Sequence, residues 1–179
     1  MLRFLILVSG LFFYGLICAA DVASVPAMPK IMVVDFILRD VSPLPDAPQE
    51  IERVALLDTV IKQTLAAHGY VLLKPCDELL KASKQAISYL FDRPELAASL
   101  GGACGADYVL MGESWKPSYL FSFPQIKLMD TRKGLKSESP LVLVTKVQME
   151  ASTLDKDVTV AAARKLALLV IDKLNALKK

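Results

Sequence analysis

The spacing of apolar side chains predicts a chain that first alternates between strands and helices. Residues 31–38, IMVVDFIL, form an almost continuous apolar run, which is typical of a strand buried on both faces. A proline-rich loop follows this run. Apolar side chains then recur every three or four positions between residues 50 and 68, which predicts a helix that ends at Gly69. Its apolar face consists of Ile51, Val54, Leu57, Ile61 and Leu65.

The rest of the chain predicts a succession of strands closed by a helix. The remaining elements are a strand at 70–73, a helical segment at 76–91 that allows a break, a second at 94–100, strands at 107–115, 119–131 and 141–151, and a helix at 157–179. The order β-α-β-α-α-β-β-β-α predicts an α+β fold that is α/β-like in its first half. Helices would pack on a single mixed sheet of about five strands.

The first twenty residues differ in kind from the rest. Arg3 precedes an uncharged apolar run, and the small residues Cys18-Ala19-Ala20 offer a cleavage site before Asp21. This pattern predicts a signal peptide at 1–20, an extended leader at 21–30 and one domain at 31–179, exported to the periplasm. Two alternatives remain: an uncleaved membrane anchor, and lipidation at Cys18, which the bulky Ile17 before it disfavours.

Composition narrows the classes of function. The formal net charge is +2, from 21 basic and 19 acidic side chains, so nothing indicates a nucleic-acid partner. The only histidine, His68, lies at a predicted helix end, and the cysteine spacing fits no zinc site. We therefore expect no metal and no cofactor. Because exported cysteines usually pair, Cys76 and Cys104 are predicted to form a disulfide.

The stretch GGACG at 101–105 invites comparison with a phosphate-binding loop. Such a loop follows a strand and opens a helix, whereas GGACG follows a predicted helix and precedes a strand. The glycine pair Gly101-Gly102 is therefore predicted to end that helix in a left-handed conformation. Cys104 has no histidine predicted beside it, so a nucleophilic role is disfavoured.

The remaining candidates are polar residues in or beside apolar strands. Asp35 interrupts the first apolar run and is expected to be ion-paired, to lie at a sheet edge or to be functional. The candidate binding patch is Glu113, Trp115, Lys116 and Ser118, since tryptophan beside charged groups is typical of interface anchors. The alternatives are a solvated strand end for the charged residues and a core position for Trp115.

Three stretches, IMVVDFIL, AAHGYVLL and CGADYVLMGESWKPSYLFSFPQIKLMDT, resemble uncharacterised secreted bacterial proteins that are grouped as a domain of unknown function. The matching positions are Asp35-Phe36, Gly105-Ala106-Asp107, Gly112, Lys116 and Ser118. The chain departs from the pattern at Pro117 and by GGAC before GAD. The pattern is more distantly similar to the amino-terminal domain of TolB and to periplasmic domains of the curli secretion pore and of penicillin-binding-protein activator lipoproteins.

This resemblance implies a mixed α/β domain with a binding role and carries over no catalytic residue. The first functional hypothesis is therefore a non-catalytic, protein-binding or accessory module whose partner is an envelope or periplasmic protein. The second is a carrier of a small ligand or cofactor, accessory to periplasmic quinoprotein alcohol oxidation, which would use Trp115, Tyr119, Phe121 and Phe123. The third is an enzyme whose site is assembled from Asp35, Glu113, Lys116 and Ser118. The oligomeric state stays open.

Overall fold

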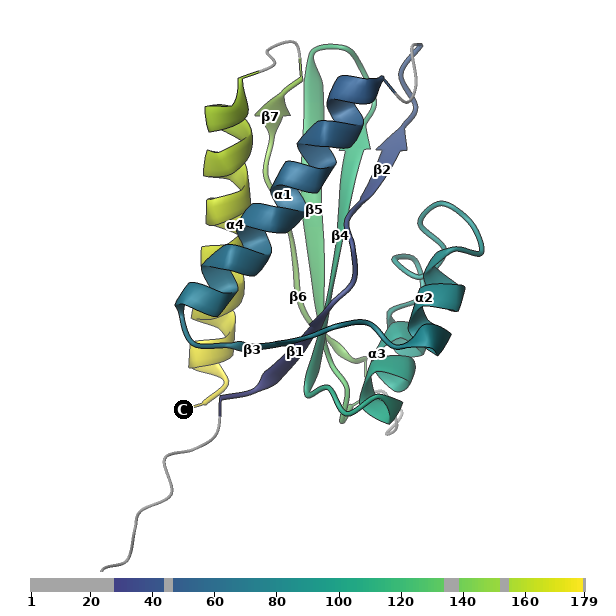
Figure 1. Ribbon diagram of the computed structural model, residues 1–179, viewed down its shortest axis with the longest axis vertical. Coiled ribbons are helices and arrows are strands. Elements are labelled where there is room, and N and C mark those ends of the chain that lie inside the picture. The colour runs from purple at the N-terminus through teal and green to yellow at the C-terminus, as the bar shows by residue number, and fades with distance from the viewer. Residues whose placement is uncertain (1–27, 44–46, 134–138, 152–154, 179) are drawn as a thin grey trace, which may run out of the picture.

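The computed structural model describes residues 28–43, 47–133, 139–151 and 155–178. Within them, one mixed sheet carries helices on both faces (Figure 1). The strands are β1 (Lys30–Val33), β2 (Ile37–Asp40), β3 (Val71–Leu73), β4 (Tyr108–Lys116), β5 (Phe121–Asp130), β6 (Leu141–Lys146) and β7 (Met149–Glu150). The helices are α1 (Pro48–Ala67), α2 (Asp77–Ser83), α3 (Pro94–Ala103) and α4 (Lys156–Ala176). The predicted α+β class is confirmed.

The sheet has the strand order β3-β1-β4-β5-β6. Strands β3, β1 and β4 are parallel, whereas β5 and β6 continue the sheet in antiparallel fashion. Two short strands extend it at one end, with β2 parallel to β4 and β7 antiparallel to β5. The expectation of about five strands missed these two extensions.

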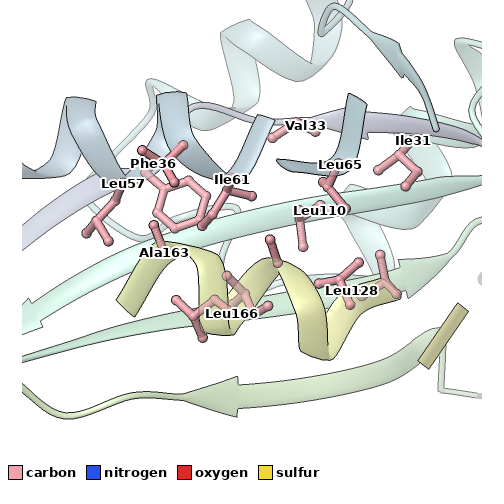
Figure 2. Close-up of a cluster of buried hydrophobic side chains, with 14 of the residues drawn as sticks. Ile31, Val33, Phe36, Leu57, Ile61, Leu65, Leu110, Leu128, Ala163 and Leu166 are labelled. Atoms are coloured by element: carbon pink, nitrogen blue, oxygen red, sulfur yellow. The ribbon is translucent and has the colours of Figure 1, made fainter. Parts of the chain in front are cut away.

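We call the two sides of the sheet the inner face, which α1 and α4 cover, and the outer face, on which α2 and α3 lie (Figure 1). Side chains of β4 alternate between them: Leu110 belongs to the core under α1 and α4, and Met111 to the core under α2 and α3. Figure 2 shows Leu57 and Ile61 of α1 meeting Ala163 and Leu166 of α4 over the inner face.

Helix α1 follows the predicted apolar stripe with one exception. Ile51 is 55% exposed, because the first turn of α1 directs Glu50 and Arg53, and not Ile51, toward the sheet. Gly69 follows α1 with φ +84°, so the predicted left-handed helix end is confirmed there.

Two predicted strands are each divided. The run at 31–38 breaks between β1 and β2, where Asp35 faces solvent and pairs with Lys62 at 2.8 Å. The run at 141–151 divides into β6 and β7, with Val147 and Gln148 between them, although the N–H of Val147 still donates to the carbonyl oxygen of Pro124 in β5. Apolar patterning does not mark either break, since apolar residues lie on both sides of it.

Two predicted helical features differ in the structure. The segment 76–91 stays helical only to Ser83, and residues 84–92 form turns in which Ser88 has φ 60°. The pair Gly101-Gly102 does not end α3 but lies within it, and the left-handed glycine is Gly105, with φ +81°. Gly101 is required for close packing, since a Cβ there would overlap the side chain of Val109 in β4.

Candidate functional site

The four residues of the predicted patch do not form one surface. Glu113 and Trp115 project from the outer face of β4, Lys116 projects from its inner face, and Ser118 lies in the turn that follows. Glu113 is completely buried and Lys116 is only 5% exposed. The sheet therefore separates two buried charges that the sequence places three residues apart.

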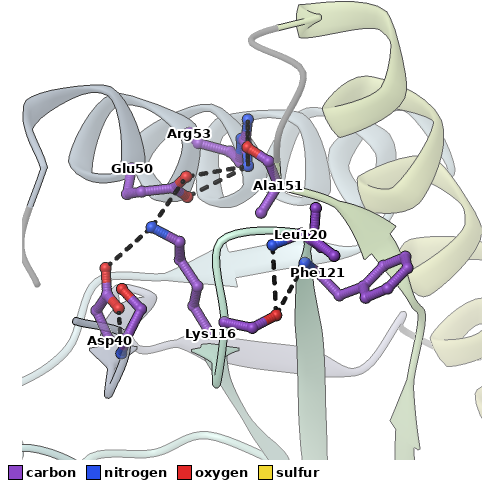
Figure 3. Close-up of polar contacts among 9 residues, drawn as sticks. Asp40, Glu50, Arg53, Lys116, Leu120, Phe121 and Ala151 are labelled. Carbon is purple, nitrogen blue, oxygen red and sulfur yellow. Dashed lines mark hydrogen bonds and ion pairs between the residues drawn. The ribbon is translucent and has the colours of Figure 1, made fainter. Parts of the chain in front are cut away.

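Lys116 belongs to a buried ionic cluster on the inner face (Figure 3). Its Nζ lies 3.2 Å from Oδ2 of Asp40 and 3.5 Å from Oε1 of Glu50. Arg53 lies 3.2 Å from the same oxygen of Glu50 and donates to the carbonyl oxygen of Ala151. The cluster thus ties β2 and β4 to α1 and to the end of β7. Two cations face two carboxylates, which is how buried charges are tolerated.

The pKa of Asp40 reflects this environment. Burial would raise the pKa of its carboxyl group, but hydrogen bonds from Ser42 and Lys116 outweigh burial and hold the pKa below the ordinary value of 3.8. Asp40 therefore stays ionised at neutral pH and keeps Lys116 in place. These contacts describe a structural clamp between strands and helix.

Ser118 shapes the turn between β4 and β5. Its Oγ accepts hydrogen bonds from the backbone N–H groups of Leu120 and Phe121, at 3.3 and 3.4 Å (Figure 3). Such bonds are typical of serine in turns. The hydroxyl group is thus occupied locally by the backbone.

Glu113 is held on the outer face by neutral donors. Its carboxylate accepts hydrogen bonds from the hydroxyl group of Ser88 and, at 2.8 Å, from Nε2 of Gln125. The guanidinium of Arg39 lies 3.8 Å away. Ser88 has the only positive φ among the described non-glycine residues, a conformation that costs free energy unless other contacts impose it. The bond to Glu113 therefore fastens the 84–92 segment to the sheet.

Trp115 lies on the part of the outer face beyond this segment. Its ring centroid is 5.4 Å from that of Phe123, and Nζ of Lys146 lies 5.6 Å from the Phe123 ring. Strand pairing places Arg39 beside Trp115 on the same face. Phe121, 37% exposed, and Val144, 56% exposed, extend this face along β5 and β6. We call these six residues the half-sheet patch: Arg39, Trp115, Phe121, Phe123, Val144 and Lys146.

Among the described elements, no helix covers the half-sheet patch. α2 and α3 pack against the other half of the outer face, through Met32, Val109 and Met129, and lie at the opposite end of β4 (Figure 1). Arg39 and Lys146 escaped the sequence-based prediction because only the strand register reveals that they adjoin Trp115. The period-2 alternation of PSYLFSF and VTK indicates which of their side chains share one face of a strand. It does not indicate which residues of other strands lie beside them.

The remaining candidates have structural partners. Asp35 is ion-paired, as expected, with its partner Lys62 reaching from α1. His68 lies at the end of α1, where its Nδ1 is 2.8 Å from the carbonyl oxygen of Thr64. Cys76 and Cys104 form the predicted disulfide, with 6.3 Å between their Cα atoms. Cys76, Glu78 and Cys104 are the one group of potential metal ligands within the described residues, and its two sulfurs are bonded to each other.

The described helices include none that is both long and apolar enough to span a bilayer. The predicted signal peptide at 1–20, with Cys18, and most of the leader lie outside the described residues.

Several solved structures are similar to this chain at low sequence identity. The hypothetical protein CT253 from Chlamydia trachomatis is 11% identical and superposes with a TM-score of 0.56, over 83% of this chain and 99% of that one. PelC from Paraburkholderia phytofirmans, described as a dodecamer, is 16% identical over 78% and 86% of the two chains, with a TM-score of 0.46. Lipoprotein GNA1162 from Neisseria meningitidis is 15% identical over 84% and 97%, with a TM-score of 0.46. At such identity the likeness to CT253 shows a shared fold alone.

Sequence comparison identifies the family. No curated protein matches the chain significantly. The distant similarity to TolB and to the curli secretion pore is not confirmed. The profile of the family DUF3280, described as "Protein of unknown function (DUF2380)", matches residues 29–155, which include all seven strands. The resemblance to a domain of unknown function is thereby confirmed, and the chain belongs to this family.

Proposed function

We propose that this protein is a non-catalytic, exported module that binds another protein of the bacterial envelope through the half-sheet patch. The observation that carries the proposal is the patch itself, a sheet face that bears three aromatic rings and that no described helix covers. Exposed apolar area that is rimmed by polar groups marks interaction surfaces. Aromatic residues and arginine are the residue types most enriched in such surfaces.

The charges of the patch indicate the kind of partner. Arg39 and Lys146 are exposed on it, whereas Glu113, the carboxylate beneath Arg39, is fully buried and hydrogen-bonded to Ser88 and Gln125. Glu150, opposite Phe121, is the acidic residue at the margin. We therefore expect the partner to present an apolar segment flanked by acidic side chains, because complementary charge steers association and selects partners.

The disulfide supports the exported location. Bonds of this kind form and persist in oxidising compartments such as the periplasm and are rare in the cytosol. Three polar residues that the sequence suggested for catalysis have structural contacts within the described residues. Lys116 forms ion pairs in a buried cluster, Ser118 accepts hydrogen bonds in a turn, and Glu113 accepts hydrogen bonds from Ser88 and Gln125. These contacts favour binding over catalysis.

Site-specific photo-crosslinking in the producing cells tests the proposal. A benzoylphenylalanine side chain is placed at Phe121 or Val144 and, as matched exposed controls on the helical side, at Ile51 or Leu168. We expect the same crosslinked protein from both patch positions and not from the controls. Lys146→Glu, at an exposed position that forms no ion pair within the described residues, should remove the product while leaving the melting temperature nearly unchanged. A product of the same identity and yield from Leu168, or one that persists in the charge-reversal variant, would refute the proposal.

A further inference from the structure

A second candidate site lies at the point where the chain changes sides of the sheet. The crossover from β1 and β2 through α1 to β3 runs over the inner face, whereas that from β3 through α2 and α3 to β4 runs over the outer face (Figure 1). The two crossovers lead to opposite neighbours of β1, so the carboxyl end of β1 is a topological switch point. Open α/β sheets bind ligands in the crevice outside the carboxyl ends of the strands at such a point.

Two adjoining cavities occupy this crevice. One, of about 570 Å³, lies at the ends of β1 and β3 and includes Val33, Leu73, Lys62 and Lys74 in its lining. The other, of about 200 Å³, lies between the β1–β2 break and the 84–92 segment. Asp35 and Leu80 line both, so the cavities form one groove. Together they fall within the size range of pockets that hold small organic molecules.

The groove has an apolar floor and a basic rim. Side chains such as Val34, Phe36 and Met111 form the floor. Of the rim residues, Asp35 is already paired with Lys62 at 2.8 Å, which leaves no free carboxylate among the residues that line the groove. Lys74 and Lys84 are exposed and, among the described residues, neither has a carboxylate within ion-pairing distance. The rim therefore offers two cations to a ligand.

The geometry points to a binding site for a small amphipathic organic anion, a carboxylate or sulfonate with an aromatic or medium-length aliphatic body. Its apolar body would lie along Leu80 and the floor, and its anionic group would reach the ammonium groups of Lys74 and Lys84. Apolar burial would supply most of the affinity, and charge-assisted hydrogen bonds would select anions over neutral analogues. This site is separate from the half-sheet patch, so it adds ligand binding to the proposed partner binding.

Fluorescence titration with 1-anilinonaphthalene-8-sulfonate tests the inference on the folded protein. We expect saturable binding that decanoate displaces and that decanol at the same concentration displaces several-fold less well. Lys74→Gln with Lys84→Gln should weaken binding about tenfold, as the loss of charge-assisted bonds does. Lys81→Gln is the matched control, because Lys81 is exposed on α2 but lines neither cavity.

Leu80→Asp provides a second test, because Leu80 lines both cavities and is only half-buried. The introduced carboxylate should abolish probe binding while circular dichroism and the melting temperature report a folded protein. Several results would overturn the inference: no saturable binding, equal displacement by decanol, equal loss in Lys81→Gln, or full binding by a folded Leu80→Asp variant. None of these outcomes bears on crosslinking at the half-sheet patch, so the two proposals fail independently.

Discussion

At the level of single residues, Gly101 shows how closely α3 approaches β4. A Cβ there would overlap Val109, so we expect Gly101→Val to lower the free energy of unfolding by about 1–3 kcal/mol or more through overpacking. Ser99→Val in the same helix is the control, because it adds the same β-branched side chain at an exposed position. Chemical denaturation measures both. Equal losses would mean that helix propensity, and not contact with β4, sets the cost.

Lys116 gives a second test at this scale. Lys116→Met keeps the length of the side chain but leaves Asp40 and Glu50 without a shared cation. Removing one partner of a buried ion pair costs about 3–5 kcal/mol. In Lys62→Met the lost pairs are partly solvated, since that side chain is 31% exposed, and the cost should stay below about 1 kcal/mol. Denaturation midpoints at neutral pH measure both losses. Similar losses in Lys116→Met and Lys62→Met would contradict a stabilising role for the buried cluster around Lys116.

The Asp40 carboxyl also predicts a dependence on pH. Its folded pKa lies below 3.8, so the ionised group stabilises the folded state above that value. This contribution is lost as the pH falls through the folded pKa. We expect the free energy of unfolding to decrease from about pH 5 downward, and to decrease less steeply in Asp40→Asn. Some pH dependence of the free energy of unfolding should remain in Asp40→Asn. The reason is Asp130, whose carboxyl pKa is also lowered, because hydrogen bonds from Arg132 outweigh the effect of burial. Asp92→Asn, at an exposed position, serves as the control.

At the level of elements, the disulfide joins the start of α2 to the end of α3. The two cysteines are 28 residues apart, and closing such a loop stabilises the folded chain by roughly 3–4 kcal/mol in the chain-entropy treatment. The Cys76→Ala, Cys104→Ala double variant should lose about that amount, as calorimetry with and without reductant can measure. Reductant should lower the melting temperature of the native protein and leave that of the double variant unchanged. Free thiols in non-reduced periplasmic material would contradict the bond.

Sequence patterns located most elements but not their interruptions. The four helices and the long strands follow apolar periodicity, which a single helix or strand displays by itself. The break at Asp35 and the turn at Ser88 depend on contacts with Lys62 and Glu113, which lie 27 and 25 residues away. Such contacts leave no local signature. The same limit explains why Gly105, and not Gly101, adopts the left-handed conformation.

The candidate site was predictable only in part for a related reason. Trp115, a candidate from the sequence, lies partly exposed beside Phe123, and its role in binding stays a prediction. Glu113 and Lys116 could not be assigned to opposite faces without knowing that β4 is extended throughout and covered on both sides there. Their partners come from the 84–92 segment and from α1, far along the chain.

At the level of the whole molecule, the proposed export predicts a defined mature end. We expect the mature protein to begin at Asp21, since the small residues before it suit cleavage of a signal peptide. Intact mass measurement and N-terminal sequencing of the exported protein test this. A mature chain that begins with a lipidated Cys18 would contradict it and would place the protein on a membrane surface.

The two ends of the described domain lie side by side. Nζ of Lys178 is 3.3 Å from Sδ of Met28 and 5.4 Å from the centroid of the Tyr70 ring, at the end of the molecule opposite β2 and β7 (Figure 1). The first and last described residues are therefore close enough in space to be joined. A short linker between residues 28 and 178 would allow circular permutation, with new termini opened elsewhere on the surface. A tether joined at residue 28 or residue 178 would leave the half-sheet patch directed away from the point of attachment.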